Sequence, residues 1–169
     1  SNGALTKIGM PFSPIIDGMK VGFDFNPTVD RIRLVTENGQ NLRLHPDLGT
    51  VVAVDGMLNP GMPQVDAAAY TNSFAGTTST VLYVIDYATD MVYQQAPPND
   101  GVLVPVGSLG IDVSDGNGFD IGGTSDMAYG VFRVGSNVGV YSINLTTGRA
   151  TKVRDLNFNP TAMALGLGF

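Results

Sequence analysis

Residues 21–54 have the sequence VGFDFNPTVDRIRLVTENGQNLRLHPDLGTVVAV, and this stretch decides the fold. It contains four short runs rich in β-branched and aromatic residues, at 21–27, 31–36, 41–45 and 50–54. Glycine, asparagine, aspartate and proline separate the runs, which is typical of strands joined by turns. Asn38-Gly39 is a strong hairpin signal between the second and third runs. The stretch therefore predicts a four-stranded antiparallel meander.

The same arrangement recurs along the chain. Runs that resemble the opening of this first unit begin near residues 22, 67, 118 and 162, so the unit is 44 to 51 residues long. We expect three repeats, at approximately 21–56, 66–108 and 117–156. A four-stranded unit of this length is typical of a β-propeller blade. A β-sandwich is the alternative, because it also contains short strands at even spacing.

Two further strands are expected at the ends of the chain. Residues 4–9 resemble the fourth strand of the third repeat, at 150–153, and residues 162–167 resemble an opening strand. The prediction is an all-β, propeller-like domain over 4–169, with about three four-stranded blades and two terminal strands; residues 1–3 resemble a cleavage remnant. Such a ring is incomplete. Exposed sheet edges invite pairing, so we expect a homodimer formed through these edges.

Composition limits the classes of function. The 169 residues include 9 Lys and Arg, 15 Asp and Glu and no Cys, with a net charge of −6. The bases are scattered, whereas phosphate recognition needs clustered positive charge, so no nucleic-acid partner is expected. No apolar run approaches the roughly 20 residues of a membrane-spanning helix, and we expect no membrane span. Only 14% of the residues are charged, as expected for strands packed on both faces.

Several stretches are similar to a known family. GFDFNPTVDRIRLV at 22–35, followed by GQNLRL at 39–44, resembles the signature of a bacterial family whose domain has no assigned function. AAAYTN at 67–72, PPNDG at 97–101 and LGIDV at 109–113 also resemble it. The resemblance covers essentially residues 4–169. It implies propeller-like repeats and an exported bacterial protein, extracellular or periplasmic, and it assigns no catalytic residues.

Two aspartates are the candidate catalytic residues. Asp24 and Asp120 occupy the same position in two opening strands, within GFDF and GFDI. In a propeller the opening strand lines the central channel, where two carboxylates could bind a cation or act as acid and base. The alternative, which we favour, is structural: each carboxylate pairs with a neighbouring arginine or caps a backbone amide.

Arg31 and Arg33 are candidate ligand-binding residues. They alternate with Ile32, so both guanidinium groups lie on one face of the predicted strand. They could bind an anionic ligand through forked hydrogen bonds. The structural alternative is that they pair with carboxylates across the sheet.

A candidate calcium site lies in the loop at 112–120. The loop supplies four oxygen-bearing side chains, Asp112, Asp115, Asn117 and Asp120, and its glycines would let the backbone fold around a cation. Its spacing does not match an EF-hand, because no glutamate closes the loop. The same residue types are common in ordinary turns, so the loop has a structural interpretation as well.

The sequence favours a non-enzymatic binding or scaffolding module, with a protein or carbohydrate ligand and no cofactor. Catalytic residues do not converge in any motif: His45 is the single histidine, and no Gly-x-Ser-x-Gly motif accompanies it. The alternative is a propeller hydrolase or lyase that uses Asp24 and Asp120 in the channel, with calcium as its cofactor.

Overall fold

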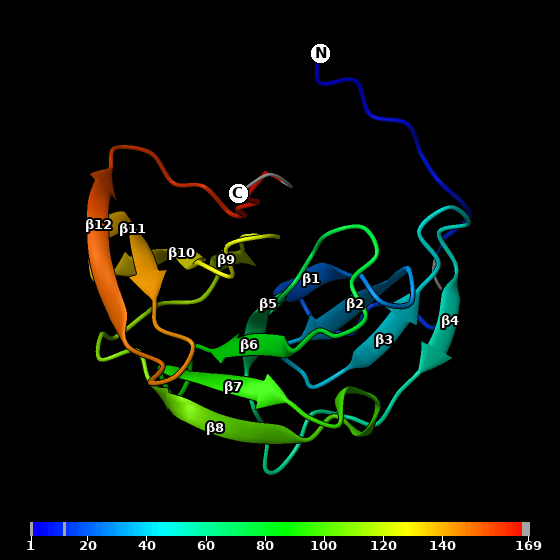
Figure 1. Ribbon diagram of the computed structural model, residues 1–169, viewed down its shortest axis with the longest axis horizontal. Coiled ribbons are helices and arrows are strands. Elements are labelled where there is room, and N and C mark those ends of the chain that lie inside the picture. The colour runs from blue at the N-terminus through cyan, green and yellow to red at the C-terminus, as the bar shows by residue number, and fades with distance from the viewer. Residues whose placement is uncertain (1, 12, 167–169) are drawn as a thin grey trace.

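Three antiparallel sheets make up the fold in the computed structural model, which describes residues 2–11 and 13–166 (Figure 1). Each sheet contains four strands, and neighbouring strands in a sheet are consecutive in the chain. The part of the chain described contains no α-helix, only the short 3-10 helix η1 (Pro98–Asp100), and its sheets close no barrel. The predicted all-β class and the four-stranded sheets are confirmed.

In the first unit, the strands begin and end within one residue of the four predicted runs. Sheet 1 contains β1 (Val21–Asn26), β2 (Arg31–Thr36), β3 (Asn41–Leu44) and β4 (Val51–Val54). Sheet 2 contains β5 (Val65–Tyr70), β6 (Leu82–Asp86), β7 (Met91–Gln95) and β8 (Leu103–Ser108). Sheet 3 contains β9 (Gly118–Ile121), β10 (Ala128–Val134), β11 (Asn137–Ile143) and β12 (Ala150–Leu156).

The three sheets lie around a common centre, which is consistent with a propeller-like arrangement. Figure 1 shows the first strands, β1, β5 and β9, nearest the centre and the last strands, β4, β8 and β12, at the rim. β1 packs against β5, and β5 packs against β9. Gly22 permits the first contact, because an added Cβ atom would lie 2.8 Å from the carbonyl carbon of Ala67. The first strands therefore approach each other closely enough to exclude side chains at this point.

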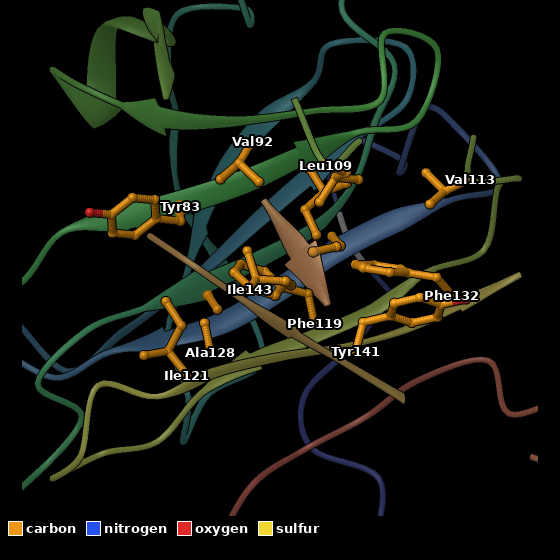
Figure 2. Packing of buried hydrophobic residues seen from close by; sticks show 14 residues of the cluster. Tyr83, Val92, Leu109, Val113, Phe119, Ile121, Ala128, Phe132, Tyr141 and Ile143 are labelled. Carbon is orange, nitrogen blue, oxygen red and sulfur yellow. The ribbon is translucent and has the colours of Figure 1, made fainter. Parts of the chain in front are cut away.

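Apolar side chains fill the spaces between neighbouring sheets. Sheets 2 and 3 share the largest cluster, in which Tyr83 and Val92 face Phe119, Phe132 and Tyr141 (Figure 2). Sheets 1 and 2 share a second cluster, which contains Val35, Leu58, Val65, Ala68, Tyr70, Leu82, Val84 and Leu103. Full burial of one such large side chain contributes about 1.5–3 kcal/mol, so these two interfaces hold the sheets together.

The other face of sheet 1 carries a third, smaller cluster. It consists of Ile32, Leu34, Leu42 and Leu44, and Ile16 from the N-terminal segment packs against it. On the same face, the first strand leaves Phe23 and Phe25 about half exposed. The N-terminal segment thus covers the middle of this face but not the part that lies on β1.

The structure differs from the prediction at the two ends of the chain. Neither residues 4–9 nor residues 162–166 form a strand. The predicted domain and the predicted remnant also include residues outside the described part of the chain, namely 167–169 and Ser1. A strand needs a neighbour that supplies ladder hydrogen bonds, and neither segment has one. Residues 162–166 nevertheless lie along the inner strand β9, where Ala162 and Met163 approach Gly118.

Candidate functional site

A cavity opens at the centre of the molecule, between the first strands of the three sheets. Its volume is about 330 Å³, and it is lined by β1, by β5, by β9 and by residues 161–164. A second cavity, of about 440 Å³, is lined by parts of β1 and β9, by Ser73 and Gly123, and by residues 164–166. Asp24 and Asp120 line both cavities. We call the two cavities together the central channel.

Asp24, on β1, is held by backbone groups of two sheets. Its Oδ1 atom accepts a hydrogen bond from the N–H of Phe25 at 2.7 Å. Its Oδ2 atom accepts one from the N–H of Tyr70, on β5, at 2.6 Å. The carboxylate therefore joins sheet 1 to sheet 2.

Asp120, on β9 of sheet 3, has the same geometry. Its Oδ1 atom accepts a hydrogen bond from the N–H of Ile121 at 2.8 Å, and its Oδ2 atom accepts one from the N–H of Leu165 at 2.6 Å. The Leu165 N–H thus binds the aspartate of β9 in the same way as the Tyr70 N–H binds the aspartate of β1. In both cases one carboxylate accepts two backbone N–H groups. One belongs to the next residue in the chain, and the other belongs to the inner segment that follows. We call this arrangement the carboxylate latch.

The charge state of Asp24 depends on its surroundings in the channel. Burial raises the pKa of Asp24 to about 7, and the negative charge of Asp120 acts in the same direction. The hydrogen bonds from Tyr70 and Phe25 favour the charged form and oppose this rise. The Asp24 carboxyl therefore changes its protonation state near neutral pH.

Asp66, on β5, is a third carboxylate of the channel. It is only 2% exposed, and its Oδ2 atom accepts N–H groups of Gly116 at 2.7 Å and of Asn117 at 3.1 Å. Burial raises the pKa of Asp66 to about 6, although the donors on Asn117 and Gly116 act in the opposite direction. Asp66 joins sheet 2 to sheet 3. Sequence reasoning missed it; an aspartate inside the apolar run VDAAAY was the available signal.

Aromatic side chains form the apolar wall of the channel. Phe23 and Phe25 line the cavity of about 330 Å³, and they are 50% and 48% exposed. Their ring centroids are 6.2 Å apart, and the rings meet edge to face at 88°. The channel therefore combines exposed aromatic surface with partly buried carboxylates.

Comparison with known proteins places the chain in a family. A family model described as "Domain of unknown function (DUF4394)" matches residues 1–166. The chain belongs to the DUF4394 family. The sequence matches none of the curated proteins with which it was compared. The family has no known function, so the DUF4394 match assigns no role to the channel residues.

The structure places the two candidate arginines of this DUF4394 domain apart from the channel. Arg33 is 2% exposed, and its guanidinium donates to Asp55 at 2.7 Å, to Asn41 at 2.7 Å and to Asn99 at 2.8 Å. It is thus engaged within the interface of sheets 1 and 2 and not with Asp24. Arg31 donates to the carbonyl oxygen of Asp30 at 2.7 Å.

Asp55 is the carboxylate that holds the buried Arg33. Burial opposes its ionisation, but hydrogen bonds from Arg43 and Arg33 outweigh this effect and keep the pKa of Asp55 below its ordinary value. Arg43 donates to both Asp55 oxygens, at 2.8 Å and 2.9 Å. Two arginines and one carboxylate therefore form a structural ion-pair network.

Three of the four candidate calcium ligands have separate partners. Asp115 forms an ion pair with Lys20 at 3.0 Å, Asn117 donates to Asp66, and Asp120 accepts backbone N–H groups. Asp112 is exposed. Within residues 2–11 and 13–166, no three His, Cys, Asp or Glu side chains gather as metal ligands. The structure does not bring these four side chains around one point.

No helix of the described chain is long and apolar enough to cross a membrane.

Proposed function

We propose that this chain is a non-enzymatic binding module, and that its ligand occupies the central channel. The observation that carries the proposal is the pair Phe23 and Phe25, which are half exposed inside a concave site. Ligand sites are typically cavities of roughly 300–1,000 Å³ with apolar walls and a few polar groups, and the channel has this character. An exposed aromatic pair gains more from contact with a ligand than from water.

The carboxylates favour binding over catalysis. Asp24 and Asp120 each accept two backbone N–H groups, one of them from the next inner segment. A general acid or base must transfer its proton to a reacting group, and a nucleophile must be free to attack. Carboxylates that join sheets are suited to fix the shape of the channel. The hydrolase or lyase alternative requires the same side chains to release those bonds.

We propose further that the module belongs to an exported bacterial protein. The support is the resemblance of residues 22–35 to an exported bacterial family, together with the absence of cysteine from the sequence. A chain without cysteine folds identically under oxidising and reducing conditions, so export imposes no disulfide requirement on it.

Nuclear magnetic resonance with a panel of small molecules tests the binding function. The panel contains neutral sugars, organic cations and organic anions, and chromogenic glycoside and ester substrates are assayed in parallel. We expect at least one member to shift the signals of Phe23 and Phe25, and no substrate to be turned over. Phe25→Ala should weaken that binding, whereas Phe158→Ala, which removes a 60% exposed ring outside the channel, should not.

Two results would overturn the proposal. One is a panel in which no member shifts the channel signals. The other is turnover that Asp24→Asn or Asp120→Asn abolishes, which would establish the hydrolase or lyase instead.

Self-association through a sheet edge is our proposal for the partner of this chain. β4 is the rim strand of sheet 1, and its Val52 and Val54 are exposed. The rim strand of sheet 3 instead carries charged side chains, such as Lys152 and Asp155, which discourage edge pairing. Light scattering should give twice the mass of 17.7 kDa, and Val52→Lys should return the chain to a monomer. A monomeric wild type contradicts this proposal.

A further inference from the structure

We propose that the central channel selects a primary organic ammonium ion, that is, an –NH₃⁺ group attached to an apolar body. The inference rests on the proposed binding function and names the chemical class of its ligand. It follows from three features of the channel: the sign of its charge, an acceptor that has no donor, and its aromatic wall.

The charged side chains that line the channel all have the same sign. Asp24 reaches it from β1, Asp66 from β5 and Asp120 from β9. Among the described residues, neither cavity of the channel is lined by lysine or arginine. Carboxylates in a partly desolvated site attract a cation more strongly than they would in water, and they repel an anion.

A buried amide indicates independently that the polar group of the ligand is a hydrogen-bond donor. Asn117 lines the same cavity and is 6% exposed. Its Nδ2 atom donates to Asp66, at 3.1 Å from Oδ2, whereas its Oδ1 atom has no hydrogen-bond partner. A buried acceptor without a donor is costly, so a ligand that supplies an N–H at this wall would be stabilised.

The polar groups of the channel therefore present acceptors. An ionised carboxylate has acceptors and no donor, and a primary ammonium group has donors and no acceptor. Each latch carboxylate retains lone pairs beyond the two that its backbone N–H donors occupy. A primary ammonium can thus bind without breaking the bonds that join the sheets.

The aromatic wall complements the apolar part of the ligand. Phe23 and Phe25 line the cavity and are about half exposed, and the face of an aromatic ring attracts a cation within about 6 Å. A bare metal ion would leave this apolar surface unused. An ammonium ion with an apolar body satisfies both the carboxylates and the rings.

Three probes of matched shape test the inference: benzylammonium, benzyl alcohol and benzoate. Each is titrated against the isotope-labelled chain while the signals of Phe23, Phe25 and Asn117 are followed. We expect benzylammonium to bind about tenfold more tightly than benzyl alcohol, as a charge-assisted hydrogen bond implies, and benzoate not to bind. The affinity for benzylammonium should rise with pH through about 7, where Asp24 ionises, and should fall with added salt.

Variants separate the charge from the fold. Asp24→Asn should weaken benzylammonium binding by about tenfold and leave benzyl alcohol binding unchanged. Asp120→Asn is the second variant, in case the first unfolds, and the melting temperature of each reports its folding. Asp47→Asn removes an exposed carboxylate outside the channel and is the matched control.

The outcomes distinguish this inference from the proposed function. Equal binding of benzyl alcohol and benzylammonium, or equal binding by folded Asp24→Asn and Asp120→Asn, would overturn the cation preference and leave the binding function standing. Binding of sugars at Phe25 without binding of benzylammonium would do the same. If no probe and no member of the wider panel binds, both are wrong.

Discussion

The side chain of Asp120 accepts a hydrogen bond from the backbone N–H of Leu165, at 2.6 Å. Asp24 accepts the N–H of Tyr70 over the same distance, so residues 162–166 lie against β9 as β5 lies against β1. The C-terminal segment therefore has the placement of an inner strand, although it has no ladder partner. The carboxylate latch, and not sheet pairing, positions it.

Removing this latch should release the C-terminal segment. A hydrogen bond to a charged acceptor contributes about 1.5–3 kcal/mol, so Asp120→Ala should reduce the exchange protection of the Leu165 amide by about tenfold or more. Hydrogen–deuterium exchange with residue resolution measures this effect. Asp47→Ala is the control for a lost exposed carboxylate, and unchanged protection of Leu165 in Asp120→Ala would contradict the role of the latch.

The stability of the protein should depend on pH through Asp24. Its pKa is about 7 in the folded chain and about 4 in an unfolded one, so between these values the folded chain binds more protons. The free energy of unfolding then falls as pH rises through this range. In urea titrations at about pH 5 and about pH 8, the wild type should lose about 2–3 kcal/mol more than Asp24→Asn. Asp66 acts in the same sense up to about pH 6, and parallel losses in both proteins would assign the effect to Asp66 instead.

The ion-pair network around Asp55 gives a third prediction. Arg33→Met should destabilise the chain by about 3–5 kcal/mol, because it removes a partner of a largely buried carboxylate. Arg43→Met, whose side chain is 32% exposed, should cost about 1 kcal/mol or less. Chemical denaturation of both variants measures the difference. Equal losses would show that burial of Arg33 does not set the strength of the network.

Close packing of the inner strands gives a fourth prediction. A Cβ atom added at Gly22 would lie 2.8 Å from the backbone of Ala67 and 2.9 Å from Ala68, so β1 and β5 would have to separate. Gly22→Ala should therefore lower the free energy of unfolding by about 1–3 kcal/mol. Gly166→Ala is the control, since an added Cβ meets nothing within 4 Å there. Equal stability of the two variants would mean that the strands adjust freely.

Calcium gives a fifth prediction. Three of the four side chains proposed as calcium ligands have other partners: Lys20 for Asp115, Asp66 for Asn117 and backbone N–H groups for Asp120. We expect the melting temperature to be the same in millimolar calcium and in chelator, because a ligand that binds only the folded state would raise it. A rise with calcium that Asp120→Asn abolishes would restore the metal site.

The strands could be predicted because their signals are local. The β-branched residues of 31–36 and the turn at Asn38-Gly39 lie within a few residues of each other, and the structure confirms the strand and the turn beside it. The terminal segment at 4–9 has the same local pattern as β12. It forms no strand because pairing depends on a neighbour, which local pattern does not supply.

The partners of the channel residues could not be predicted in the same way. Asp24 and the Tyr70 N–H are far apart in sequence, and a backbone donor has no residue-type signature. Arg33 is opposite Asp24 in the ladder, so the two side chains leave the sheet on the same face. The Arg33 guanidinium nevertheless binds Asp55, because neighbours on one face of a sheet need not form an ion pair. Sequence placed the carboxylates on inner strands, and only the fold shows what they hold.

The carboxylate latch has a consequence for how such a chain could change in length. Each latch joins one repeat only to the segment that follows it. In sheet 2, Ala69 occupies the position of Asp24 and Asp120, and Asp66 joins sheet 2 to sheet 3 instead. A duplicated unit would carry with it a carboxylate for its successor and a backbone N–H for its predecessor. Arrays whose contacts are limited to neighbours tolerate such insertions, so gene duplication could add a unit here without redesign of the others.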